Sequence, residues 1–110
     1  MKVTVWLPIR TVSEMNAREN WRTRAKRAKM QRGMARCMCA RYGAVLLRAI
    51  RLVRVSPREL DDDNLRASFK HIRDGVADAF GVDDRHLLWE YDQEKGEPKQ
   101  YAVRIELIGR

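Results

Sequence analysis

The segment Asp63–Phe80, DNLRASFKHIRDGVADAF, carries the clearest helical pattern in the chain. Its apolar residues recur at intervals of three and four positions, the spacing that puts side chains on one face of an α-helix. They are Leu65, Phe69, Ile72, Val76, Ala79 and Phe80. Asp63 is an N-cap candidate, and Gly81 stands where a C-cap glycine is expected. The pattern therefore predicts an amphipathic helix over residues 63–80.

Two strands and a second helix are predicted before this segment. Residues 2–8, KVTVWLP, alternate apolar residues with others and end at Pro8, which is typical of a strand. Residues 11–43 have apolar residues at helical spacing with basic residues between them. They predict a long basic helix that stops at Gly43 and could be interrupted at Gly33. Residues 44–55, AVLLRAIRLVRV, predict the second strand.

Two further strands are predicted after the amphipathic helix. They cover residues 82–94 and 99–109, and residues 95–98, KGEP, form the turn between them. The resulting order β-α-β-α-β-β predicts an α/β (α+β) fold with a small mixed β-sheet and two main helices. The length of 110 residues predicts a single domain over residues 1–110.

The composition indicates the cellular location of the protein. No apolar run approaches the ~18 residues that suggest a membrane span, and residues 1–10 have the pattern of a strand and not of a signal peptide. Cys37 and Cys39 are one residue apart, with no further Cys or clustered His to complete a zinc site. We expect reduced thiols, a cytoplasmic location, no membrane and no organic cofactor.

Charge is distributed unevenly along a chain whose net charge is +8. Residues 10–54 contain thirteen Lys and Arg against two Glu, whereas residues 59–97 contain twelve Asp and Glu against five Lys and Arg. A basic half suits a polyanion such as nucleic acid. Two oppositely charged faces that attract each other would produce the same composition, so both interpretations stay open here.

Acidic residues stand at both ends of the predicted amphipathic helix. Asp61 and Asp63 precede or begin it, and Asp83 and Asp84 follow its end. Closely spaced carboxylates destabilise one another unless a cation neutralises them, and oxygen ligands favour a hard ion such as Mg²⁺ or Mn²⁺. Alternatively, the first acids complement the helix dipole and the second pair lies in an ordinary turn.

Residues 61–84, DDDNLRASFKHIRDGVADAFGVDD, resemble the signature of the RusA family of Holliday-junction resolvases. In that family an Asp-x-Asp-Asn opens a helix, a pair of aspartates follows it, and a β-hairpin comes next. The first strand, which ends in LP, and the basic helix after it also fit. The resemblance implies a homodimeric, Mg²⁺-dependent endodeoxyribonuclease, with Mn²⁺ as a substitute, that resolves four-way DNA by paired symmetric nicks in DNA recombination and repair.

The resemblance also implies roles for single residues. Asp61, Asp63 and Asp84 match the family's catalytic, metal-binding aspartates. The family's catalytic lysine would fall on Ala67, so a substitute is needed. Lys70, seven residues after Asp63, returns to nearly the same side of a continuous helix two turns on, and Arg66 is the other candidate.

The predicted DNA contacts are basic residues that would bind phosphates without regard to sequence. They are Arg22, Lys26, Lys29, Arg32, Arg36 and Arg66. Trp21 and Trp89 fit core positions of their elements. A straight helix over residues 63–80 would be ~27 Å long, so Asp84 reaches Asp63 only if the helix breaks near Gly75 or a second subunit supplies it.

Two alternatives to the resolvase come from other classes. Because Ala67 stands where the family has its catalytic lysine, the sequence also fits a RusA-like protein that binds branched DNA without cleaving it. The separated charges suit a small basic domain that binds a partner or has only a structural role.

Overall fold

The computed structural model describes residues 1–15, 18–43, 46–82 and 87–110. In chain order the elements are β1 (Lys2–Leu7), α1 (Trp21–Ala40), β2 (Leu47–Ser56), α2 (Asp62–Ser68), α3 (Lys70–Phe80), β3 (Leu88–Lys95) and β4 (Ala102–Gly109). The strands form one sheet in the order β1-β4-β2-β3, in which β4 is antiparallel to both neighbours and β2 is parallel to β3. The prediction of an α+β fold with a small mixed sheet is confirmed.

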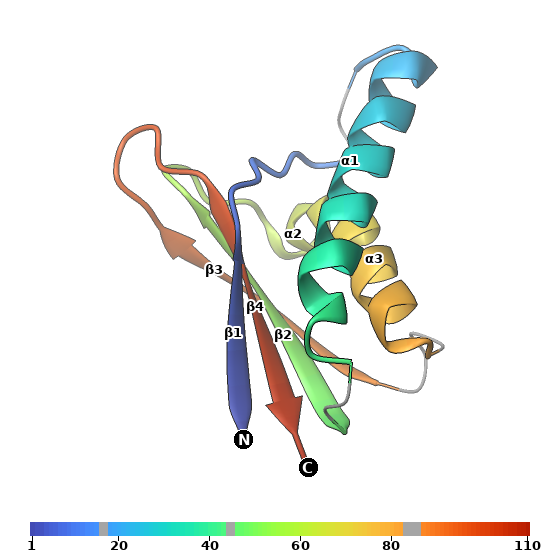
Figure 1. The fold of residues 1–110 in the computed structure, drawn as a ribbon. Coiled ribbons are helices and arrows are strands. Elements are labelled where there is room, and N and C mark those ends of the chain that lie inside the picture. Colours follow the sequence, from blue (N-terminus) through green and yellow to red (C-terminus); the bar gives the residue numbers. More distant parts are fainter. Residues whose placement is uncertain (16–17, 44–45, 83–86) are drawn as a thin grey trace.

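The core lies between the sheet and the helices, which cover one of its faces (Figure 1). Alternation along the strands turns every second side chain toward the helices, and these residues are almost fully buried. They include Leu7, Ile50, Leu52, Val103, Ile105 and Leu107 from the strands and Phe69, Ile72 and Val76 from the helical segment. The apolar spacing that predicted the amphipathic helix thus identifies the face that packs on the sheet.

The predicted helix over residues 63–80 is divided at Phe69. This residue leaves helical geometry with φ −96° and ψ 1°, and its ring is fully buried beside Tyr91, with 6.0 Å between ring centroids. The cap is also displaced, because Asp61 and not Asp63 accepts the N-cap hydrogen bond, from the backbone N–H of Asn64 at 2.9 Å. The predicted C-cap at Gly81 is confirmed by its φ of 60°.

The long basic helix is confirmed but shorter than predicted. α1 begins at Trp21, where Asn20 is the N-cap, and it continues through Gly33 without interruption. The loop before it is held by Arg27, whose guanidinium donates to the carboxylates of Glu14 and Glu19. Trp21 is 73% exposed, so its predicted core position is wrong.

β3 and β4 do not form the hairpin that the RusA resemblance implied. β2 lies between them, and the connection crosses over one end of the sheet, where the Gly96 N–H donates to the Ser56 carbonyl at 2.9 Å. The apolar alternation of β4 suits a central strand, whereas the polar composition of β3 suits an edge strand.

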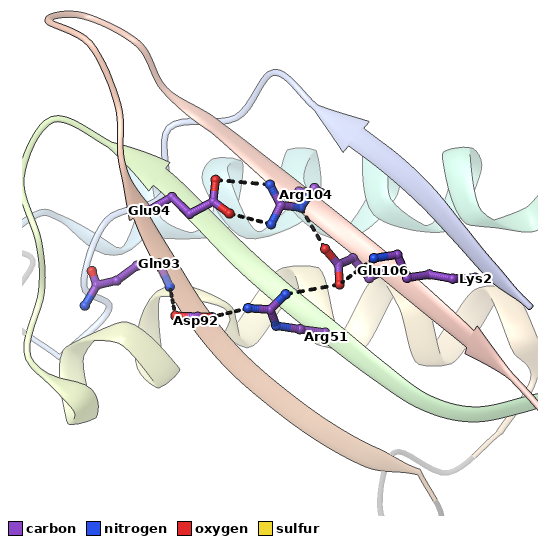
Figure 2. Close-up of polar contacts among 7 residues, drawn as sticks. All are labelled: Lys2, Arg51, Asp92, Gln93, Glu94, Arg104 and Glu106. Carbon is purple, nitrogen blue, oxygen red and sulfur yellow. Dashed lines mark hydrogen bonds and ion pairs between the residues drawn. The ribbon is translucent and has the colours of Figure 1, made fainter.

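The face of the sheet opposite the helices is covered by an ion-pair network instead of a second layer (Figure 2). Glu106, only 4% exposed, accepts from Arg104 at 2.8 Å and from Arg51 at 3.2 Å. These arginines also pair with Glu94 and Asp92 at the edge strand. The long side chains of the network shield the strands beneath them from water.

Cys37 and Cys39 are free thiols, as predicted, and burial raises the pKa of Cys39 to about 12. Across the described residues, every helix is either too short or too polar to cross a lipid bilayer.

Candidate functional site

The candidate site begins with a cavity of about 520 Å³ at the end of the sheet where β1 and β2 both terminate. We call it the arginine pocket. The segment that follows β1, the end of β2 and the residue before β4 meet there because β4 runs antiparallel between these two strands. The pocket is lined by Arg10, Thr11, Val12, Ser13, Arg54, Ser56, Pro57, Arg58, Leu60 and Tyr101.

Arg54 is the buried cation of this pocket, with 8% of its surface exposed. Its Nε donates to the Thr11 hydroxyl at 3.1 Å and its Nη1 donates to the Arg58 carbonyl at 2.6 Å. Burial and the neighbouring charge of Arg10 lower the pKa of Arg54. Among the described residues no carboxylate pairs with Arg54, so this charge is held in place by neutral groups only.

Two further guanidinium groups add to the positive charge of the pocket. Arg10 lies over the ring of Tyr101, 4.4 Å from its centroid, and Arg58 is exposed at the rim. None of the described lining residues is Asp or Glu. A low-dielectric recess with several cations and no counter-charge attracts an anion strongly.

An acidic turn borders the arginine pocket. Asp61 follows the lining residue Leu60, and its Oδ1 accepts from both the backbone N–H and the side-chain amide of Asn64, each at 2.9 Å. Ser13, another lining residue, donates its hydroxyl hydrogen bond to the Asn64 Oδ1. Asn64 therefore ties the turn to the pocket, and the residue before it, Asp63, is exposed.

The predicted site of three carboxylates is not seen as a unit. No three acidic, His or Cys side chains of the described residues form a group that could hold a metal ion, and Asp84 lies outside the described residues. Asp61 stabilises the start of α2 as its cap, which is one physical reason for an acid at that position. Of the three predicted ligands, the structure describes Asp61 and Asp63, both exposed at the start of α2.

Lys70 and Arg66 lie at a second cavity, of about 620 Å³, between the junction of α2 with α3 and the strand β3. We call it the aromatic pocket, lined by Arg66, Ala67, Lys70, Arg73, Asp74, Trp89 and Tyr91. Lys70 was predicted to lie on the same side of one continuous helix as Asp63, but the helix is divided at Phe69 and Lys70 begins α3. Asp63 is not among the lining residues of this pocket.

The other predicted DNA-binding residues are all on α1 and exposed, but they are not equivalent. Arg32 donates to Asp78 at 2.6 Å and so joins α1 to α3. Lys26 and Lys29 flank an apolar groove, and Arg22 lies 5.4 Å from the ring centroid of Trp21. Arg36 is exposed further along the same helix. The basic face of α1 is therefore partly structural.

Arg10, Arg54 and Arg58 were not predicted as site residues from the sequence. One feature of the sequence indicates this site. Arg54 lies on the same face of β2 as Ile50 and Leu52, which are fully buried. A charge placed on a core-facing position at the end of a strand indicates a site.

Comparison with known proteins assigns no family. No family model matches the chain. An uncharacterised protein of Xylella fastidiosa is 40% identical in an alignment of 82 residues, and the match covers 66% of this chain and 54% of that protein. The chain spans about half the length of this relative.

Solved structures of 2C-methyl-D-erythritol-2,4-cyclodiphosphate synthase are among those that match the chain. One is 17% identical with a TM-score of 0.36 and covers 70% of this chain and 48% of the synthase. A second structure, of the form bound to CDP, is 19% identical with a TM-score of 0.37. It covers 81% of this chain and 57% of the synthase. The Plasmodium vivax synthase is 11% identical with a TM-score of 0.33. It covers 76% of this chain and 57% of that synthase. Scores this low transfer no activity to this chain.

These comparisons correct the identification made from the sequence. The prediction of the RusA family is wrong, since no family model matches the chain and the β-hairpin of the family signature is not formed, because β2 lies between β3 and β4. The predicted Holliday-junction resolution, the endodeoxyribonuclease activity with its role in recombination and repair, and the alternative of an inactive junction binder are contradicted with it. Four-way DNA as the partner is contradicted too, and the homodimer, which only that resemblance implied, loses its basis.

Proposed function

We propose that the arginine pocket binds the phosphate group of a small phosphorylated molecule. The observation that carries this proposal is the buried guanidinium of Arg54, fixed by Thr11 and by the Arg58 carbonyl and without a described carboxylate partner. Guanidinium groups hold phosphate through two parallel hydrogen bonds, which makes arginine the favoured residue for this ligand.

The electrostatics of the pocket support an anion and not a neutral ligand. A buried charge without a counter-ion destabilises the folded state, and Arg10 adds repulsion to Arg54. A bound phosphate would remove both effects at once. Tyr101 lines the same cavity, and its hydroxyl can donate to a remaining phosphate oxygen.

We propose further that Asp61 and Asp63 hold a divalent cation next to the bound phosphate. Mg²⁺ is typically held by one or two carboxylates together with phosphate oxygens of the ligand, and Mn²⁺ accepts similar ligands. The chain offers this pair of carboxylates at the border of the pocket, and Asn64 keeps one of them oriented. The bound ion would neutralise phosphate charge that the arginines leave uncompensated.

The first prediction tests the phosphate site through Arg54→Met. We expect the dissociation constant for glycerol 3-phosphate, measured by calorimetry, to rise at least ~10-fold, because a hydrogen bond to a charged group contributes about 1.5–3 kcal/mol. The unfolding free energy without ligand should stay equal or increase, since an apolar side chain of similar length replaces a buried unpaired charge.

The matched control is Arg48→Met, which removes an exposed arginine from the same strand. It should leave the affinity unchanged, and glycerol should not bind to any variant. Equal affinities for glycerol 3-phosphate in wild type and Arg54→Met would refute the proposed phosphate site.

The second prediction concerns the cation. Mg²⁺ should raise the affinity for glycerol 3-phosphate by roughly 10-fold, because shared ligands couple the two binding events by typically 1–3 kcal/mol. The double variant Asp61→Asn, Asp63→Asn should abolish this increase while α2 keeps its cap, since Asn caps helices as well as Asp does. An undiminished Mg²⁺ effect in the double variant would remove these carboxylates from the cation site. Asp62→Asn is the control.

A further inference from the structure

The geometry points to a second ligand site: we propose that the aromatic pocket binds a mononucleotide. This goes beyond the proposed phosphate site, because the two cavities share no lining residue and lie on different elements. The aromatic pocket is formed where α2 ends and α3 begins, beside β3 at the edge of the sheet. Its volume of about 620 Å³ is within the range of small-molecule sites.

Two aromatic residues of β3 form the wall that would contact the base. Trp89 and Tyr91 are two residues apart, so both point to the same face of the strand, and both are half-buried. Phe69 is stacked against Tyr91 with an interplanar angle of 21°, which fixes the tyrosine ring. A rigid aromatic wall that remains accessible is suited to stacking with a planar ring.

Guanidinium groups lie over both rings. Arg73 is 4.8 Å from the ring centroid of Trp89 and also donates to the Tyr91 hydroxyl, whereas Arg66 is 5.7 Å from the ring centroid of Tyr91. Lys70 begins α3 at the same cavity. Arginine planes extend the stacking surface, and the three cations together favour a ligand with a phosphate group.

Asp74 is the one acidic residue among the described lining residues. A carboxylate in a cationic pocket excludes a ligand that is anionic throughout but accepts hydrogen bonds from a sugar diol. The three parts of a mononucleotide thus each have a counterpart: the rings for the base, Asp74 for the ribose hydroxyls, and Lys70 with Arg66 for the phosphate. Neither a simple phosphate nor an uncharged aromatic compound would use all of them.

The experiment reads the pocket through Trp89. The chain has three tryptophans, and Trp6 and Trp21 are 52% and 73% exposed, so Trp6→Phe and Trp21→Phe leave a folded chain with Trp89 as its single indole. We expect AMP to quench its fluorescence saturably. Adenosine and inorganic phosphate should each bind at least ~10-fold more weakly, since each lacks contacts worth a factor of ten or more. Absent or non-saturable quenching by AMP would overturn the proposal.

Two variants in the single-tryptophan chain separate this site from the phosphate site. Lys70→Gln should raise the dissociation constant for AMP at least ~5-fold, and the exposed Lys29→Gln should not change it. Arg54→Met should leave AMP quenching intact even if it abolishes binding of glycerol 3-phosphate. If Lys70→Gln has no effect, or if inorganic phosphate quenches as strongly as AMP, the pocket does not recognise a nucleotide. Circular dichroism of each variant verifies folding.

Discussion

Gly75→Ala should lower the free energy of unfolding by about 2–3 kcal/mol, within the range for inserting a methyl group into a packed interface. Gly75 lies in α3 directly against α1, and an added Cβ would stand 2.3 Å from the Arg32 carbonyl oxygen and 2.9 Å from the Ala35 Cβ. The nearest atom belongs to the backbone, so no rotamer change relieves the clash. α1 and α3 would have to move apart, which opens the core beneath them.

The matched control is Gly33→Ala, in the middle of α1. Apart from its chain neighbours and the backbone of its own helix, no atom of the described residues lies within 4 Å of the position that its Cβ would occupy. Alanine should therefore stabilise the chain by about 0.5–1 kcal/mol, because glycine loses more backbone entropy in a helix. Urea denaturation of both variants measures the contrast. If Gly75→Ala were as stable as Gly33→Ala, the close approach of the two helices would be wrong.

The same glycine shows how far local patterns predict the fold. The order of the elements and the apolar face of the helical segment follow from spacing, because the periods of 2 and 3.6 residues reflect one buried side. Gly75 looked like a point where the helix could break, whereas it serves close packing between helices. The actual break at Phe69 depends on burying its ring beside Tyr91, a contact with a strand that comes later in the chain.

The sheet order also depends on contacts distant in sequence. Two consecutive strands with a short turn usually form a hairpin, but β4 pairs with β1 and β2, because its apolar residues at Val103, Ile105 and Leu107 are buried only in a central position. Sequence spacing shows which strands have an apolar face and does not show their neighbours.

The candidate site was predicted only in part. Asp61 and Asp63 could be predicted as site residues because they are only two positions apart in the sequence and stand at the start of a predicted helix. The cations of the arginine pocket come from segments 44 residues apart, as Arg10 and Arg54 illustrate, and only the folded sheet brings them to one edge. Clusters built from distant segments leave no local motif.

The second large effect is expected at Glu106. Glu106→Gln should lower the unfolding free energy at pH 7 by about 3 kcal/mol, near the lower end of the cost of breaking a buried ion pair. The neutral amide would leave Arg104, Arg51 and Lys2 converging on a position that is 4% exposed (Figure 2). Asp92 and Glu94 still compensate part of this charge, which limits the loss.

The pH dependence identifies the cause of this loss. Burial alone would raise the pKa of Glu106, but hydrogen bonds from Arg104 and Arg51 and the charges of Lys2 and Arg51 outweigh it, so the pKa is lowered below its ordinary value of 4.5. The stabilisation by the ionised carboxylate is thus complete above pH 4.5 and disappears as the pH falls through the lowered pKa. Urea denaturation at a series of pH values should show the wild type losing its advantage over Glu106→Gln in this acid range.

Glu94→Gln is the control: the side chain is 49% exposed, and surface pairs contribute at most about 1 kcal/mol. Equal losses at pH 7 for both variants would show that burial of Glu106 adds nothing to the network.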